Sequence, residues 1–227
     1  MKTNFFLAGL TGLLLVAQPA GAAMLNYASG TLNAAIPDAN INGYQNTLTI
    51  SGQNDPANVV SDVNVKLNFS GGYNGDLYVY LSHGSGFSVL LNRVGRTGGN
   101  SFGYGDAGFN ITLDDGAGTD IHAYGGNGGN QLTGTFQPDA RNSDPALVLQ
   151  IAPRNAYLNA FNTLDVNGDW TLFVADMSGG DVSTLVSWEL DITAVPEPAT
   201  VALGLFAAGF ILLQGGRAWR KRRTAQE

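Results

Sequence analysis

The chain has 227 residues, no cysteine and a formal net charge of −7. Without cysteine it has no disulfides, so a hydrophobic core must hold together whatever folds. Between Met24 and Ala194, 16 acidic residues stand against only five basic ones, and the resulting charge of −11 argues against nucleic-acid binding.

The N-terminus has the features of an export signal. A lysine precedes an apolar run from Phe5 to Val16, and small residues at 20–22 suit the cleavage pocket of a signal peptidase. We therefore expect residues 1–23 to be a signal peptide that signal peptidase removes. A retained membrane helix is the alternative, but the run is too short to favour it. Residues 24–35 are then an N-terminal extension of the exported protein.

The middle of the chain alternates apolar and polar residues with a period of two. This pattern predicts strands with one buried face, separated by turns rich in Gly, Asn, Asp and Ser. It predicts an all-β antiparallel sandwich or jelly roll over residues 36–194. The clearest strands are Val63–Phe69, Leu77–Leu81, Trp170–Val174 and Trp188–Ile192, and long loops are expected between Gly95 and Gly129.

Catalytic chemistry has little support in the sequence. A serine protease needs a nucleophile, a histidine and a carboxylate together, and the only histidines are His83 in a Gly/Ser turn and His122 beside a glycine-rich loop. Neither lies in a subtilisin-like context, so we predict no catalytic residues and no enzyme activity. Asp114 and Asp115 leave a glycan hydrolase as a further alternative, although neighbours on a strand point to opposite faces.

The sequence predicts calcium as a cofactor, because loops rich in Asp, Asn and Gly supply the oxygen ligands that it prefers. Asp76 opens a strand after such a loop, and Asp114 and Asp115 close another. A third candidate, residues 165–169, imitates the start of an EF-hand but has Trp170 where glycine is required. The alternative is that these carboxylates form turns and caps without metal.

Two further features suggest binding surfaces. Residues 125–133 mimic one repeat of a calcium-binding β-roll, but a single copy has no neighbour to stack on, so we expect a flexible loop. Five tyrosines could form a surface on which sugars stack, although tyrosines also pair across strands. They are Tyr73, Tyr78, Tyr80, Tyr104 and Tyr124.

The C-terminus has the features of a membrane anchor. Residues 200–219 would span about 30 Å as a helix, the thickness of a bilayer core. Positive charge at one end stays on the cytoplasmic side, so the domain would face outward. A buried core helix is the alternative. The basic end, 217–223, contains Arg217, Arg220, Lys221, Arg222 and Arg223.

The middle of the chain resembles the P domain (P/Homo B) of subtilisin-like proprotein convertases. The stretches VSDVNVKLNFSGGYNGDLYVYLSHGSGFSVLLNRVGRTGGN and LNAFNTLDVNGDWTLFVADMSGGDVSTLVSWELDIT carry the resemblance. It implies a jelly-roll sandwich of the kind that stabilises a subtilisin-type catalytic domain, and we expect no such domain to precede it here. It also implies calcium at Asp76, Asp114 and Asp115, which match the Gly-Asp-Leu and Asp-Asp motifs of the family.

The tail, 195–227, is similar to the PEP-CTERM sorting signal of Gram-negative bacteria. Its motif, 195–200, begins with Val195, Pro196, Glu197 and Pro198. The resemblance implies an inner-membrane intermediate, recognition by an exosortase, and delivery to the cell surface or the extracellular biofilm matrix. Because the two prolines favour an extended chain and lack backbone donors, we expect the motif to stay accessible and to join neither fold.

These observations predict an exported, non-enzymatic β-sandwich that is sorted to the cell surface or the extracellular space and binds envelope protein or exopolysaccharide. The main alternative is a stand-alone P domain that docks on a subtilisin-like envelope protease and modulates it.

Overall fold

The computed structural model describes residues 21–53, 57–196 and 206. Its elements are strands and short 3-10 helices, in agreement with the all-β prediction. They are β1 (Ala23–Ala28), β2 (Ala34–Ala35), β3 (Asn40–Ile50), β4 (Ala57–Gly71), η1 (Asn74–Asp76), β5 (Leu77–His83), β6 (Gly86–Asn92), β7 (Gly108–Leu113), η2 (Ile121–Ala123), β8 (Leu132–Phe136), η3 (Leu158–Phe161), β9 (Gly168–Asp176) and β10 (Ser183–Pro196).

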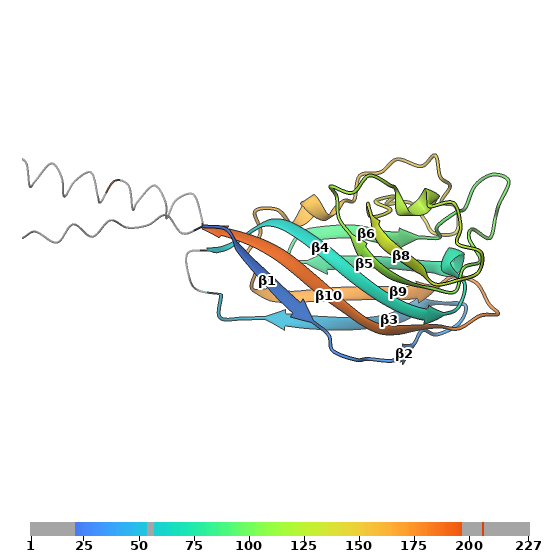
Figure 1. Ribbon diagram of the computed structural model, residues 1–227, viewed down its shortest axis with the longest axis horizontal. Coiled ribbons are helices and arrows are strands. Elements are labelled where there is room, and N and C mark those ends of the chain that lie inside the picture. Colours follow the sequence, from blue (N-terminus) through green and yellow to red (C-terminus); the bar gives the residue numbers. More distant parts are fainter. Residues whose placement is uncertain (1–20, 54–56, 197–205, 207–227) are drawn as a thin grey trace, which may run out of the picture. The chain divides into compact units, whose positions relative to one another are not determined.

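The strands form two sheets (Figure 1). The first, sheet A, has the order β1-β10-β4-β7-β8, with β2 also paired to β10. The second, sheet B, has the order β3-β9-β5-β6. Neighbouring strands run antiparallel in both sheets except for β7 and β8, which run parallel. This arrangement confirms the prediction of a mainly antiparallel all-β domain.

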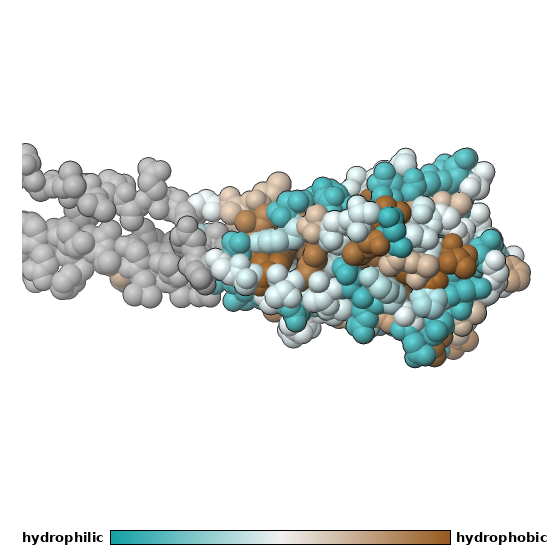
Figure 2. Space-filling view, turned by 90° about the horizontal axis from the view of Figure 1, so that it is seen from below, coloured by the Kyte–Doolittle hydropathy of each residue, from teal (hydrophilic) through white to brown (hydrophobic). Residues whose placement is uncertain are grey.

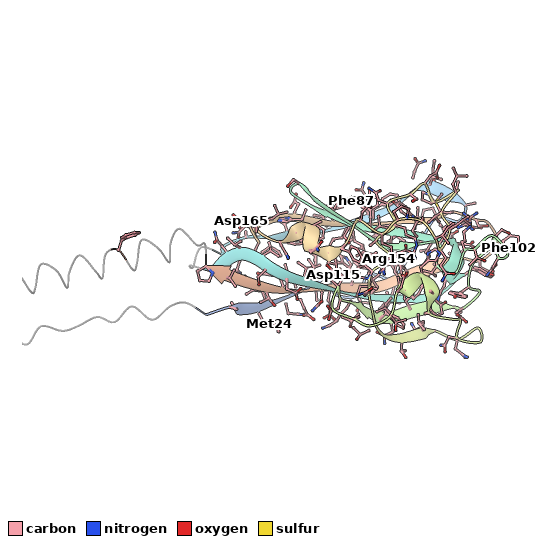
Figure 3. The ribbon with its side chains drawn as sticks, turned by 90° about the horizontal axis from the view of Figure 1, so that it is seen from above. Met24, Phe87, Phe102, Asp115, Arg154 and Asp165 are labelled. Carbon is pink, nitrogen blue, oxygen red and sulfur yellow. The ribbon has the colours of Figure 1, made fainter. Side chains whose placement is uncertain are left out.

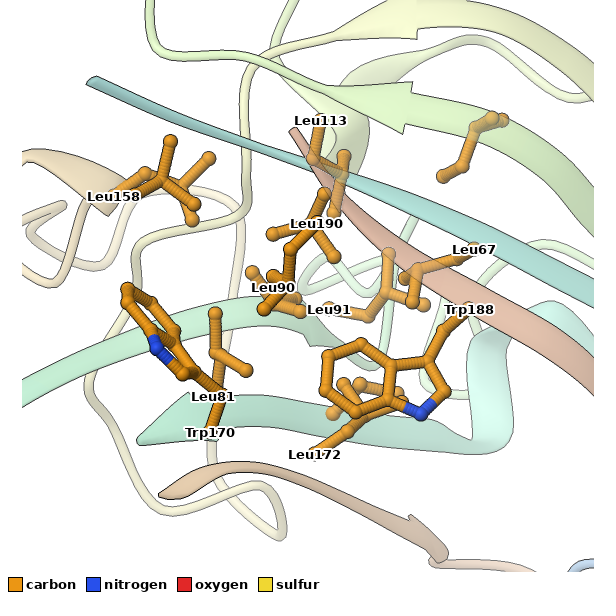
Figure 4. Packing of buried hydrophobic residues seen from close by; sticks show 14 of the residues in the cluster. Leu67, Leu81, Leu90, Leu91, Leu113, Leu158, Trp170, Leu172, Trp188 and Leu190 are labelled. Atoms are coloured by element: carbon orange, nitrogen blue, oxygen red, sulfur yellow. The ribbon is translucent and has the colours of Figure 1, made fainter. Parts of the chain in front are cut away.

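One hydrophobic core lies between the sheets, and the predicted alternation explains it. Along β5 every second side chain is buried, starting with Leu77, and the same holds for β4 from Val63 to Phe69. Trp170 on β9 and Trp188 on β10 are the largest buried side chains (Figure 4). Their indole nitrogens donate to the Val166 carbonyl oxygen at 3.0 Å and the Asn46 amide oxygen at 2.7 Å, so neither buried polar group lacks a partner.

Residues 24–35, which we expected to precede the sandwich as an extension, contribute β1 and β2 to sheet A. β1 pairs with β10 over its whole length, from Ala23 opposite Ala194 to Ala28 opposite Glu189. Leu25 and Tyr27 pack against the core on one side of β1, while Met24 is exposed on the other. The segment therefore has the alternation of a strand, but in a run of only a few residues.

The glycine-rich region, 95–129, is mostly irregular, as expected, but it also contains β7 and η2. Two glycines let its loops approach closely. A side chain at Gly75 would lie 2.2 Å from the Phe102 carbonyl oxygen, and one at Gly103 would lie 2.3 Å from that of Val94. Gly103 also has φ of +80°, which disfavours residues with a side chain. Because neither glycine has a side chain, the loop can lie directly against η1 and the residues just after β6.

Hydrophobic residues on the face seen in Figure 2 form small separate groups among hydrophilic ones. Within residues 21–53 and 57–196, no helix has both the length and the apolar character that a membrane crossing requires. The predicted membrane span, 200–219, lies outside the described residues except for Phe206. The basic end and residues 1–20 of the predicted signal peptide also lie outside them.

Candidate functional site: an aromatic surface and the sorting junction

Four aromatic side chains gather on the outer face of sheet B, and we call them the aromatic surface. Tyr78 and Tyr80 come from β5, Phe87 from β6 and Phe173 from β9. Tyr80 lies at the centre: its ring centroid is 4.7 Å from that of Phe173, 5.1 Å from that of Phe87 and 5.9 Å from that of Tyr78. All four are half-buried, so part of each ring remains open to a partner.

Hydroxyl groups continue this face of sheet B beside the aromatic surface. The Thr47 and Thr171 hydroxyl oxygens lie 2.9 Å apart, and the Thr49 hydroxyl donates to an Asp169 carboxylate oxygen at 2.7 Å. Thr171 and Asp169 precede Phe173 at two-residue steps on β9, which places them on the same face. The four strands of sheet B contain no lysine or arginine. The face thus combines ring surfaces with hydroxyls and has no positive charge of its own.

The five tyrosines suggested by the sequence do not share one surface. Only Tyr78 and Tyr80 belong to the aromatic surface, because they point to the face of β5 that is opposite to the buried face of Leu77. Tyr104 and Tyr124 pack together elsewhere, with ring centroids 4.4 Å apart. Phe87 and Phe173 were not predicted: β6 has no clear alternation around Phe87, whereas Phe173 alternates with Leu172 and Val174 on β9 and could have been placed on the outer face.

A buried carboxylate holds the loop that resembled a β-roll repeat. Asp106 is only 2% exposed, and its oxygens accept hydrogen bonds from the Tyr124 hydroxyl and the backbone N–H groups of Asn127 and Gly129, each at 2.7 Å. Burial raises the pKa of Tyr124, which keeps its hydroxyl protonated as a donor. Charge-assisted bonds of this kind are strong. Asp106 therefore anchors the loop that we expected to be flexible.

Asp76, a predicted calcium ligand, is paired with an arginine. Its carboxylate accepts from an Arg93 guanidinium nitrogen at 3.1 Å, and Arg93 Nε donates to the Gly75 carbonyl oxygen at 2.9 Å. Burial raises the pKa of Asp76, and the positive charge of Arg93 opposes that rise. A cation at Asp76 would have to compete with this guanidinium.

A second buried carboxylate, Asp176 at the end of β9, was not predicted as a site residue. Its side chain has 0% exposure, and one oxygen accepts from the Ser178 backbone N–H at 3.1 Å while the other has no partner. Burial raises the pKa of Asp176 to about 6, and the charges of Asp76 and Asp38 add to the rise. Nothing in the local sequence distinguishes this aspartate, because its burial depends on neighbouring strands.

Asp114 and Asp115 have separate structural contacts. An Asp114 oxygen accepts from the Gly116 N–H at 2.6 Å, which closes a turn. The two Asp115 oxygens accept from the N–H groups of Leu158 and Asn159 at 3.1 and 2.8 Å, at the start of η3 (Figure 3). Across residues 21–53 and 57–196, no three His, Asp or Glu side chains gather in a way that could hold a metal ion.

Both histidines are occupied by structural contacts. His83 stacks on Trp170 with ring centroids 3.9 Å apart, and its two ring nitrogens lie 3.0 and 2.6 Å from the carbonyl oxygens of Asp169 and Asp165. His122 has 0% exposure, with one ring nitrogen 2.7 Å from an Asp139 oxygen and the other 3.1 Å from the Arg96 carbonyl oxygen. Each ring therefore bridges oxygen acceptors inside the fold.

The sorting motif begins inside the last strand. Val195 and Pro196 are the final residues of β10 and lie opposite Val59 and Ala57 of β4. The expectation that the motif joins neither fold is therefore wrong for these two residues. Proline lacks a donor, but it is tolerated at the end of a strand, where one missing bond does not interrupt the ladder. Glu197 and Pro198 lie outside the described residues.

Comparison with known families agrees with this position. The model of the PEP-CTERM protein-sorting motif matches residues 194–223. The match begins at Ala194, so its first three residues are also the last three of β10. It implies an exported protein of a Gram-negative bacterium that an exosortase recognises and sorts to the surface.

Two solved structures have a loose likeness to this chain. They are crystal structures from Aeromonas sobria, one of a serine protease in complex with a chaperone and one of the serine protease. Identities are 15% and 16% and TM-scores 0.44 and 0.42, over 79% and 77% of this chain. The chain spans only 28% and 27% of the matched chains, and the likeness is too loose to carry an argument about function. No curated protein matches the sequence.

The raised pKa of Asp176 predicts a pH-dependent stability. The native state keeps this proton up to about pH 6, whereas an unfolded aspartate loses it near 3.8. The native state therefore binds more protons between these values, and the free energy of unfolding falls as pH rises through them, by up to about 3 kcal/mol. We expect Asp176→Asn to flatten this decline in chemical denaturation at pH 4 to 7. An unchanged slope, with Asp144→Asn as an exposed control, would contradict the assignment.

Calcium binding at Asp76, Asp114 and Asp115 stays a prediction of the sequence. It requires that calcium stabilise the folded state and raise the melting temperature relative to excess chelator. Thermal unfolding of the exported protein under the two conditions tests this. Equal melting temperatures would contradict the calcium prediction and leave these residues with the structural contacts described above.

Proposed function

We propose that this protein is an exported, non-enzymatic binding module that an exosortase sorts to the cell surface or the extracellular matrix. The observation that carries the proposal is the PEP-CTERM match at 194–223, which begins within the last three residues of the last strand of a folded β domain. In this arrangement the sandwich is the domain that is delivered, and the tail is the signal that sorts it. The predicted signal peptide, 1–23, would supply the export step.

The absence of enzyme activity is part of the proposal. The contacts of His83 and His122 support it, because a general base must reach a proton on a substrate, and these ring nitrogens already face oxygens of the protein itself. Asp114 and Asp115 favour a structural role over glycan hydrolysis, since their oxygens accept backbone N–H groups of nearby turns.

We further propose that the aromatic surface binds a neutral polysaccharide. Sugar rings stack their C–H faces on aromatic rings and hydrogen-bond through their hydroxyls, and this face offers Tyr80 and its neighbours beside Thr47 and Thr171. The lack of lysine and arginine in the strands of sheet B disfavours an acidic polymer. A matrix or envelope polysaccharide is therefore the ligand class that this surface suits.

The second hypothesis makes the protein a stand-alone P domain that modulates a subtilisin-like protease. It rests on the sequence resemblance over the middle of the chain, which also implies the jelly-roll form of the sandwich. Recovery of such a protease as the main partner from envelope extract would favour it over polysaccharide binding.

Sorting predicts that the motif determines the fate of the chain. We expect Glu197→Ala to reduce the processed form by about tenfold or more, with the precursor accumulating in the inner membrane, because an acidic contact to the enzyme is lost. Cell fractionation and intact mass measure this. Glu189→Ala, which alters a half-buried glutamate on β10 that pairs with Lys66, is the control. Normal processing of the Glu197 variant would argue against exosortase sorting.

If the aromatic surface binds polysaccharide, removing the ring of Tyr80 at its centre weakens that binding. We expect Tyr80→Ala to weaken binding of the exported protein to matrix polysaccharide about tenfold, since stacking on one aromatic ring contributes on the order of 1 kcal/mol and its removal also disturbs its neighbours. Binding to immobilised polysaccharide measures the change. The control is Phe102→Ala, which alters a 65% exposed ring outside the aromatic surface. Equal binding by both variants and the unmodified protein would contradict this assignment.

A further inference from the structure

The sorting motif is attached to the sandwich without a spacer. Ala194 has 0% exposure and pairs with Val60 of β4, and on its other edge it lies opposite Ala23, the last residue of the predicted signal peptide. The next residue, Val195, is already the first of the motif and lies opposite Val59. Figure 1 shows β1 beginning beside the end of β10. The last rungs of a central strand are therefore also the first residues that the sorting enzyme must recognise.

These rungs include two of the three register shifts in the β10–β4 ladder. The register between β10 and β4 shifts between Thr193 and Ala194, and again between Val195 and Pro196. Pro196 adds no N–H group, so its pairing with Ala57 has fewer hydrogen bonds than an ordinary rung. Strand ends with poor pairing open at low free-energy cost compared with the rest of a sheet.

The other side of these rungs is also occupied. Val59 forms a bridge with Asp165, and the Val60 N–H donates to the Leu164 carbonyl oxygen at 2.9 Å. Asp165 lies at the end of the sandwich where β10 finishes (Figure 3). The first residues of β4 thus pair with β10 on one edge and with residues 164–165 on the other. When this end of the sheet opens, β10 can separate while β4 keeps its other partner.

Enzymes that cut or transfer a peptide bond bind their substrate as an extended chain whose backbone N–H and C=O groups are free to pair with the enzyme. In the folded sandwich, β4 occupies the pairing edge of Val195 and Pro196. We propose that exosortase engages this chain only after the last rungs of β10 have separated from β4, so that the folded domain limits the rate of its own sorting. The inference rests on the proposed function, because it assumes that an exosortase acts on this motif.

The first test moves the motif off the sheet. A six-residue Gly-Ser linker inserted between Ala194 and Val195 lets linker residues occupy the last rungs and leaves the motif unpaired. We expect the precursor to mature about threefold faster or more, because the unpaired form is no longer a minor population. The same linker between Gly179 and Gly180, in an exposed turn before β10, is the control and should mature at the normal rate.

The second test cross-links the rung that lies between the two register shifts. Val60 and Ala194 are cross-strand partners, and such pairs have Cα separations of about 4.5–5.5 Å, within the range for a disulfide. The chain has no other cysteine to compete. We expect Val60→Cys with Ala194→Cys to slow maturation about fivefold or more in the oxidising envelope and to recover with reductant, because the cross-link holds the adjoining rungs together.

Pulse-chase labelling of the full chain in cells, with intact mass to identify the product, measures both variants. Thermal unfolding of each checks that the sandwich has folded, since an unfolded domain would also expose the motif. Normal maturation rates for both the linker and the cross-linked variant overturn the proposed gate while the unmodified chain is still sorted. If the unmodified chain is not matured at all, and Glu197→Ala makes no difference, it is the proposed function that fails.

Discussion

The pairing of β10 with β4 is the interaction on which the rest of the structure depends. β10 is a central strand of sheet A and pairs with β1, β2 and β4, so it joins the first strands of the domain to the last. Its buried side chains, including Trp188 and Leu190, form a large part of the core. Because these contacts join residues far apart in the chain, the sandwich is complete only when the residues next to the sorting motif are in place.

This coupling gives the end of β10 two roles. Its residues pair with β4 in sheet A, and they are also the first residues of the PEP-CTERM sorting motif. Under the proposed gate, pairing of β10 with β4 and recognition of the motif by the sorting enzyme exclude each other, because both use the same backbone N–H and C=O groups. The physical basis is the obligatory pairing of backbone N–H and C=O groups, which one strand can satisfy with only one partner on each edge.

The few basic residues of the domain make their contacts within the fold. Each makes an ion pair or donates to carbonyl oxygens, so the excess of aspartate determines the character of the surface. A neutral or cationic partner is favoured over an acidic one. The contacts are those of Lys66 with Glu189 and Asp191, Arg93 with Asp76, Arg96 with the carbonyls of Pro145 and Ala146, Arg141 with Asp120 and Asp139, and Arg154 with the Pro138 carbonyl.

The amino-acid sequence by itself determined the all-β character of the domain, its acidity and the sorting motif, because period-two alternation, charge and a short linear motif are local properties. It also placed Tyr78 and Tyr80 on one face. Only the tertiary structure brought Phe87 and Phe173 to them, buried Asp176 and joined Val195 to β4. These features depend on which strands become neighbours and in which register, and that choice is made by side chains far away in the chain.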